Sequence, residues 1–130
     1  MKPISVLIVD DHELVRVGLQ TLLSRQDCFS VIGEATTVSE AIAESSRLQP
    51  DVVLMDVRLS GGSGVDACRA IRDSCPGTRV LFLSSYEDDE AVLAAVVGGA
   101  SGYLLKQVSA EELLRAIHAV AQGQSILDPA

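Results

Sequence analysis

Each of four short apolar runs in this sequence ends on charged or hydroxyl side chains. These terminal residues are Asp10 and Asp11, Asp56, Ser84 and Lys106. Two carboxylates about 4 Å apart repel each other by roughly 4 kcal/mol at an effective dielectric constant of about 20. Three carboxylates in one cleft would therefore favour a bound cation. Their hard oxygen ligands suit Mg²⁺, with Mn²⁺ as a substitute, and no Cys stands at these positions to bind a softer metal.

A carboxylate, a hydroxyl and an ammonium beside a magnesium ion are suited to phosphoryl transfer. We expect Asp56 to be the nucleophile that takes a phosphoryl group as an acyl phosphate. Lys106 and the metal ion would neutralise the charge that develops on the phosphoryl oxygens. Ser84 would donate a hydrogen bond to a phosphate oxygen. These groups together predict an acceptor site for a phosphoryl group.

For these residues to meet, the apolar runs must be strands of one sheet. Five short runs rich in Val, Ile and Leu alternate with helical patterns, at residues 6–9, 29–33, 52–55, 80–83 and 102–105. Most of the runs are nearly continuous, which is typical of strands buried on both faces of a parallel sheet. The first helical pattern places one set of apolar residues on a common face, namely Leu14, Val15, Gly18, Leu19, Leu22 and Leu23.

Start signals for helices agree with this alternation. Thr37-x-x-Glu40 and Ser109-x-x-Glu112 are capping boxes at the expected helix entries. Five β-then-α units predict a doubly wound α/β fold, a flavodoxin-like three-layer sandwich. We expect its parallel five-stranded sheet to have the strand order 2-1-3-4-5.

Ligands of such a sheet bind beyond the carboxyl ends of the strands, where the strand order reverses. That point lies between the first and third strands of the predicted order. Asp10 and Asp11 end the first strand, and Asp56 ends the third. The acidic residues are therefore expected at the place where this architecture holds a ligand.

The chain resembles, over essentially its whole length, the receiver domains of two-component response regulators. The matching segments are LIVDDHELVR, PDVVLMDVRLSGGSG, VLFLSSYEDDE and GASGYLLK, in the order and spacing of that family. The residues of DDHELVR, SSYEDDE and GASGYLLK further resemble the NarL/FixJ-type branch. Members of that branch usually carry a C-terminal LuxR-like helix-turn-helix domain that binds DNA.

The resemblance assigns roles at the metal site. Asp56 matches the phosphoacceptor, which also ligates the metal. Asp11 matches the acid that ligates the metal directly, and Asp10 matches a neighbour that acts through water. The backbone carbonyl of Arg58 would supply a further ligand.

The resemblance also assigns the residues that would respond to the phosphoryl group. Ser84 matches a switch hydroxyl, Tyr103 a switch aromatic residue and Lys106 the lysine that pairs with the phosphate. Ser84 replaces the commoner Thr and keeps the hydroxyl. Ser60 stands where the family usually has Pro, and we expect it to loosen the loop after the third strand without removing a chemical group.

Several residues also have simpler interpretations. Asp10-x-x-Glu13 is itself a capping pattern, so Asp10 can cap the first helix besides serving the metal. His12 lies beside the acids, but Mg²⁺ prefers oxygen ligands, and we expect His12 to face solvent. The GGSG run at 61–64 lacks the GK[ST] of a phosphate-binding loop and is interpreted as a flexible exit from the third strand.

The composition restricts the classes of partner. The formal net charge of −8 disfavours phosphate backbones, so we expect DNA contacts only through another domain. No apolar run reaches the roughly 18 residues of a membrane helix, and the N-terminus lacks a signal region of about 7–15 apolar residues. A cytoplasmic protein without membrane contacts is expected. Cys28, Cys68 and Cys75 lack CxxC spacing and are expected to be reduced, buried thiols.

A signalling switch is the expected function, rather than an enzyme with an external substrate. A sensor histidine kinase would phosphorylate Asp56, and the domain would catalyse only this step and a slow autodephosphorylation. A Mg²⁺-dependent phosphatase with an aspartyl nucleophile is one alternative, although DDH lacks the DxD motif of such enzymes. A receiver-like interaction module that is never phosphorylated is another, against which the intact acids argue.

Phosphorylation is expected to control self-association and an attached DNA-binding domain. Residues 91–97 are apolar all round, more than a helix packed on one face requires. We expect a homodimer through this helix with the fifth strand and last helix, or through the first and last helices. Arg58 and Tyr86 are expected to shield the phosphosite. Residues 1–124 would form the receiver domain, and 125–130 would begin a linker to a missing C-terminal DNA-binding domain.

Overall fold

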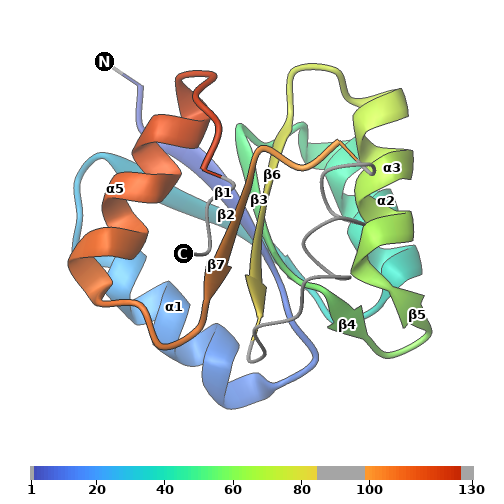
Figure 1. The fold of residues 1–130 in the computed structure, drawn as a ribbon, viewed down its shortest axis with the longest axis horizontal. Helices are drawn as coiled ribbons and strands as arrows, with labels where there is room; N and C mark the ends of the chain where they lie inside the picture. The colour runs from blue at the N-terminus through green and yellow to red at the C-terminus, as the bar shows by residue number, and fades with distance from the viewer. Residues whose placement is uncertain (1, 85–98, 127–130) are drawn as a thin grey trace.

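A five-stranded parallel sheet forms the centre of the protein (Figure 1). The computed structural model describes residues 2–84 and 99–126. The strands are β1 (Ile4–Val9), β2 (Phe29–Ala35), β3 (Val52–Asp56), β6 (Arg79–Ser84) and β7 (Gly102–Leu105). Their order is β2-β1-β3-β6-β7, and each neighbouring pair is parallel. This is the predicted order of the five strands, so the predicted fold class is confirmed.

Helices cover both faces of the sheet. The described helices are α1 (Glu13–Ser24), α2 (Val38–Leu48), α3 (Gly64–Ser74) and α5 (Ala110–Ala121). In Figure 1, α1 and α5 lie on one side of the sheet and α2 and α3 on the other. The predicted apolar helix at 91–97 lies outside the described residues, as do Ser85 and Tyr86.

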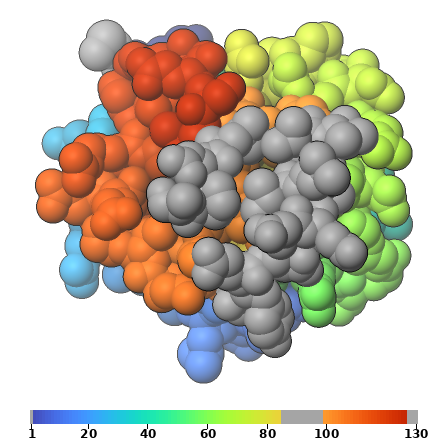
Figure 2. All heavy atoms as spheres, in the orientation of Figure 1, coloured from blue at the N-terminus to red at the C-terminus, as the bar shows by residue number. Residues whose placement is uncertain are grey.

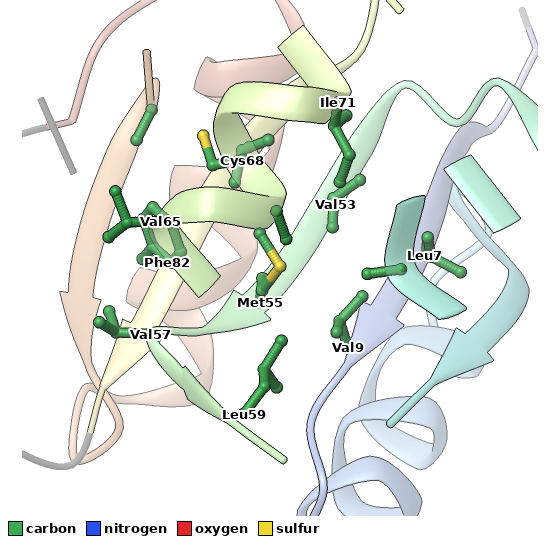
Figure 3. Packing of buried hydrophobic residues seen from close by; sticks show 14 of the residues in the cluster. Leu7, Val9, Val53, Met55, Val57, Leu59, Val65, Cys68, Ile71 and Phe82 are labelled. Atoms are coloured by element: carbon green, nitrogen blue, oxygen red, sulfur yellow. The ribbon is translucent and has the colours of Figure 1, made fainter. Parts of the chain in front are cut away.

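The alternation of side chains along each strand supplies an apolar layer to both faces. Val6 and Ile8 pack in the cluster beneath α1 and α5. Leu7 and Val9 pack in the cluster beneath α2 and α3, which Figure 3 shows around Val53, Met55, Val65, Cys68, Ile71 and Phe82. Because the residues of the central strand β3 up to Met55 alternate between these two apolar layers, that run is apolar throughout.

The three cysteines are free thiols. Cys68 and Cys75 are buried, as predicted, and burial raises the pKa of the Cys68 thiol to about 11. Cys28 is exposed, so the prediction of a buried thiol is wrong there. It lies in the connection between α1 and β2, and such connections run over the surface.

Two of the three predicted helix caps form. The hydroxyl of Thr37 accepts from the Glu40 backbone N–H at 3.1 Å, and the hydroxyl of Ser109 accepts from Glu112 in the same way at 3.1 Å. The capping role predicted for Asp10 is wrong, because His12 is the N-cap of α1. The Asp10 carboxylate accepts from the His12 backbone N–H at 2.8 Å, outside the helix.

The segment after β3 is a hairpin instead of the flexible exit that the sequence suggested. β4 (Arg58–Leu59) pairs with β5 (Gly62–Ser63) in antiparallel fashion. Gly61 and Gly62 have φ of 86° and 148°, a region that favours glycine. Gly64 is required for another reason, since a Cβ added there would overlap the carbonyl oxygen of Asp56. The sequence GGSG thus makes the turn and lets α3 begin close to β3.

The chain after α5 returns to the edge of the sheet. Ile126 donates its backbone N–H to Ser101 at 2.8 Å and accepts from Tyr103 at 2.8 Å, in a parallel bridge beside β7. Its side chain packs against the cluster beneath α1 and α5. The domain boundary at residue 124 stays a prediction, and Ile126 makes these contacts beyond it. Within residues 2–84 and 99–126, the helices are too short or too polar to cross a bilayer.

Candidate functional site

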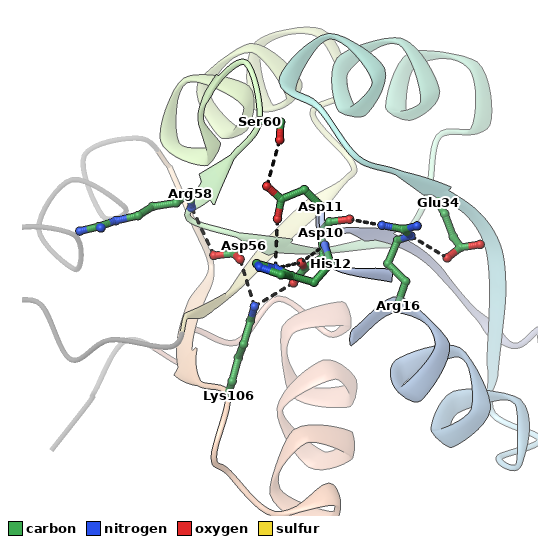
Figure 4. A network of polar contacts seen from close by, with 9 residues as sticks. All are labelled: Asp10, Asp11, His12, Arg16, Glu34, Asp56, Arg58, Ser60 and Lys106. Atoms are coloured by element: carbon green, nitrogen blue, oxygen red, sulfur yellow. Dashed lines mark hydrogen bonds and ion pairs between the residues drawn. The ribbon is translucent and has the colours of Figure 1, made fainter. Parts of the chain in front are cut away.

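The carboxyl ends of β1 and β3 bring three carboxylates together (Figure 4). The two strands are neighbours, so Asp10 and Asp11 after β1 lie beside Asp56 at the end of β3. One ligand atom from each of these residues and from His12 lies within 4.8 Å of all the others. The acids therefore lie together as the sequence indicated, because β1 and β3 are neighbouring parallel strands whose carboxyl ends meet at one edge of the sheet.

Lys106 joins two of the carboxylates from the far side of β6. Its Nζ lies 2.9 Å from Oδ2 of Asp10 and 3.0 Å from Oδ2 of Asp56. Burial lowers the pKa of Lys106, but its hydrogen bonds to Asp10 and Asp56 outweigh burial, and the pKa is raised above its ordinary value. Lys106 is therefore an ammonium ion at neutral pH.

Asp10 is the most enclosed of the acids, with 3% of its surface exposed. Burial raises the pKa of Asp10, but hydrogen bonds from Lys106 and His12 outweigh it, and the pKa lies below its ordinary value. The two residues are thus ionised together and form an ion pair within the site.

The site keeps an excess of negative charge after this pairing. Three carboxylates and one ammonium leave a net charge of −2, with the His12 ring counted as neutral. A divalent cation would balance that charge, and the donor atoms are carboxylate oxygens, which Mg²⁺ and Mn²⁺ prefer. The donor set therefore fits the predicted metal.

Asp56 is held by contacts to both of its oxygens. Oδ2 meets Lys106, and Oδ1 accepts the backbone N–H of Arg58 at 3.2 Å. The Arg58 side chain extends away from the acids in Figure 4. The Asp56 side chain is 10% exposed. Its roles as phosphoacceptor and metal ligand, and that of the Arg58 carbonyl as ligand, stay predictions.

Ser84 lies on β6, which is next to β3, and Tyr103 lies on β7, the strand beyond β6. Ser84 ends β6, one residue after Leu83, which pairs with Asp56. Its carbonyl oxygen accepts the backbone N–H of Lys106 at 2.8 Å. Tyr103 in β7 is 1% exposed and packs in the cluster beneath α2 and α3. Both are close to the site in the sheet, and their switch roles stay predictions.

His12 faces solvent, as predicted, with 66% of its side chain exposed. The ring contacts were not predicted: Nδ1 lies 2.9 Å from Asp10 and 3.0 Å from Asp11. Both contacts follow from its place as N-cap directly after the two acids. One helical turn after His12 lies another residue of the site that was not predicted from the sequence.

That residue is Arg16, which ties α1 to the ends of two strands. Its guanidinium donates to the carbonyl oxygen of Asp10 at 2.7 Å and lies 3.3 Å from the Glu34 carboxylate on β2. Side chains of a helix point back toward its N-terminus, so an arginine in the second turn of α1 can reach the end of β1. The contact of Arg16 could have been predicted from this direction of helical side chains. The contact of Glu34 could have been predicted from its position near the end of its strand.

Comparisons with known proteins agree with this geometry. Residues 6–118 match the family model described as the response regulator receiver domain. The DNA-binding transcriptional activator DevR/DosR of Mycobacterium tuberculosis is 46% identical over 125 residues, which cover 96% of this chain and 58% of that protein. The response regulator VraR of Staphylococcus aureus is 39% identical over 126 residues, or 97% of this chain and 60% of that protein. The chain thus spans about three fifths of the length of these relatives.

Solved structures show the same arrangement of the chain. The signal receiver domain of the response regulator NarL from Mycobacterium tuberculosis has a TM-score of 0.91 and 33% identity, covering 95% of this chain and 100% of that one. A LuxR-family two-component response regulator from Aurantimonas has a TM-score of 0.91 and 34% identity, covering 96% and 89%. This chain belongs to the receiver domain family of the two-component response regulators.

Proposed function

We propose that the domain is a signalling switch that accepts a phosphoryl group on Asp56. The observation that carries this proposal is the contact of Lys106 with both Asp56 and Asp10, at 3.0 and 2.9 Å. Through this contact the Lys106 ammonium lies against the proposed nucleophile, which supports the assignment. The membership of the chain in the receiver domain family supports the proposal.

The chemistry follows from these groups. An oxygen of Asp56 attacks phosphorus, the new O–P bond forms as the bond from phosphorus to the donor breaks, and the donor leaves with the bonding electron pair. Lys106 neutralises charge on the incoming phosphoryl oxygens, and the Ser84 hydroxyl donates a hydrogen bond to one of them.

The divalent cation belongs to the same proposal. Asp11, Asp56 and the carbonyl of Arg58 would hold it, with Asp10 acting through water. A bound Mg²⁺, or Mn²⁺ in its place, supplies further positive charge to the phosphoryl oxygens. The net charge of −2 among the three acids and Lys106 supports this assignment.

A sensor histidine kinase is the proposed donor. An apolar groove of about 320 Å³ lies beside Lys106, between α1 and α5, lined by Leu14, Val15, Gly18, Leu19, Leu22, Leu83, Val108, Ala110 and Leu113. Leu14 is 86% exposed there and suits a protein partner that approaches the site. The acidic charge of the domain disfavours direct DNA contact, so we assign DNA binding to a C-terminal domain outside this chain.

Labelling with acetyl phosphate tests the proposal. We expect the wild-type protein to gain one phosphoryl group in the presence of Mg²⁺, read by intact mass, and no gain after a chelator is added. Asp56→Asn should not be labelled, whereas Asp73→Asn, which changes an exposed acid of α3, should be labelled like wild type. A wild-type protein that takes no label, or an Asp56→Asn variant that does, would overturn the proposal.

A further inference from the structure

Asp11 differs from the other acids of the site in its partners. Lys106 contacts Asp10 and Asp56, whereas in the described part of the chain the Asp11 carboxylate is contacted by a hydroxyl and an imidazole. Oγ of Ser60 donates to Oδ2 of Asp11 at 3.0 Å, and Nδ1 of His12 lies 3.0 Å from Oδ1 (Figure 4). The Asp11 side chain is 27% exposed, and these contacts involve one carboxylate oxygen each.

Ser60 lies in a hairpin that packs against the rest of the domain. It follows β4 at the tip of the hairpin, directly after Leu59, which is 8% exposed and packs in the cluster beneath α2 and α3. Ser60 also forms a parallel bridge with Thr37, the N-cap of α2. A Cβ added to Gly62 would lie 3.3 Å from Val38, so the hairpin is packed closely against the start of α2. The hydroxyl therefore reaches Asp11 from an ordered element.

We propose that Ser60 is a positioning residue for Asp11, whose carboxylate it holds in the orientation that serves the divalent cation. This inference rests on the proposed function, which assigns Asp11 to the metal. A carboxylate has about four acceptor positions, so one bond from Ser60 leaves the others for a cation. A hydrogen bond of this kind restricts a metal ligand to fewer orientations before the metal binds. Less conformational entropy of the side chain is therefore lost when it does.

The proline that usually stands here in the family cannot make this contact, because it has no hydroxyl. Without Ser60, water would replace the donor at the exposed edge of Asp11, and the carboxylate would turn more freely. Residue 60 therefore adjusts the affinity of the site for its cation in this chain. It does so without touching the phosphoryl group or Asp56.

Calorimetric titration of the metal-free protein with MgCl₂ tests the inference, with Mn²⁺ binding read by electron paramagnetic resonance as a second measurement. Ser60→Ala should weaken Mg²⁺ binding on the order of 10-fold, the lower end of the effect of losing such a partner. Ser60→Thr keeps the hydroxyl and should bind within about 2-fold of wild type. Ser24→Ala is the matched control, because the Ser24 hydroxyl donates to the Thr21 carbonyl oxygen on an exposed helix end far from the acids.

Thermal unfolding in chelator distinguishes positioning from a general effect on folding. We expect Ser60→Ala and Ser24→Ala to have similar melting temperatures without metal. Equal Mg²⁺ affinity of Ser60→Ala and wild type, or a Ser60→Thr variant as weak as Ser60→Ala, would overturn the inference. A wild-type protein that binds no Mg²⁺ and takes no label would instead overturn the proposed function.

Discussion

At the scale of single residues, repulsion between the carboxylates of the site destabilises the folded chain. Asp10 and Lys106 offset each other's charge, but Asp11 adds a carboxylate that Lys106 does not contact. Two such charges about 4 Å apart repel by about 1 kcal/mol in water and more in a less polar medium. A site that accumulates charge in this way is suited to bind a cation and is destabilised without one.

The first prediction concerns that repulsion. Asp11→Asn should raise the free energy of unfolding by about 1 kcal/mol in chelator at pH 7, since it removes one charge and keeps an oxygen for Ser60. Urea denaturation measures this change. Added Mg²⁺ should stabilise wild type through binding to the folded state and should have little effect on the variant.

The control for this prediction is Asp73→Asn, an exposed acid on α3 away from the site. It should change the free energy of unfolding by less than about 0.5 kcal/mol. A loss of stability in Asp11→Asn measured in chelator would contradict the account of the acids as mutually repelling.

At the scale of elements, the position of Asp56 depends on how closely α3 approaches the end of β3. The backbone N–H of Gly64 donates to the carbonyl oxygen of Val57 at 2.6 Å. A Cβ on Gly64 would lie 2.9 Å from that oxygen and would overlap the carbonyl oxygen of Asp56. The glycine therefore lets the helix begin against the strand, and any larger residue would push the strand end that carries Asp56.

Gly64→Ala tests this close approach. We expect the free energy of unfolding to fall by about 1–3 kcal/mol, as for other overpacked sites, and the rate of acetyl phosphate labelling to fall as well. Gly18→Ala is the matched control, because nothing lies within 4 Å of a Cβ added to this helical glycine. It should raise the stability by about 0.5–1 kcal/mol. A Gly64→Ala protein as stable and as readily labelled as wild type would show that the strand end tolerates displacement.

At the scale of the whole molecule, the chemically reactive side chains and an apolar surface lie at the same edge of the sheet. The carboxyl ends hold the acids, and the apolar groove between α1 and α5 opens next to them beside Lys106. Figure 2 shows the start of α1, in blue, at the lower edge of the visible face, with the orange segment that leads into α5 above it. Leu14 and Val17 are exposed on α1, at 86% and 52%. Surfaces of this kind are used for contacts between proteins, and here the surface adjoins the proposed phosphosite.

A phosphorylation-sensitive homodimer is the prediction at this scale. Light scattering should show a larger mass with beryllofluoride and Mg²⁺ than without them. Leu14→Asn should abolish the increase if the α1 and α5 face forms the dimer, and should leave it unchanged if the contact lies on the β7 and α5 face. A protein that stays monomeric at high concentration with beryllofluoride would contradict the prediction.

The sheet, its strand order and the convergence of Asp10, Asp56 and Lys106 could be predicted from the sequence. Lys106 lies 96 residues from Asp10 along the chain. The contact was still predictable, because apolar periodicity identifies each strand and parallel strands end at one edge. The capping residues Thr37 and Ser109 were predictable for a similar reason, since a cap and its partner lie within one helical turn.

Other contacts could be identified only from the packed structure, because no periodicity of the sequence encodes them. Ser60 and Asp11 are 49 residues apart and meet because a hairpin packs against α2. Leu14 shares the apolar face of α1 but is exposed, because the residues of that face that pack against the core cluster begin farther along the helix, at Leu19. Ile126 pairs with β7 because α5 returns the chain to that edge. Each of these depends on where two packed elements end relative to one another, and the local sequence of either element does not contain that distance.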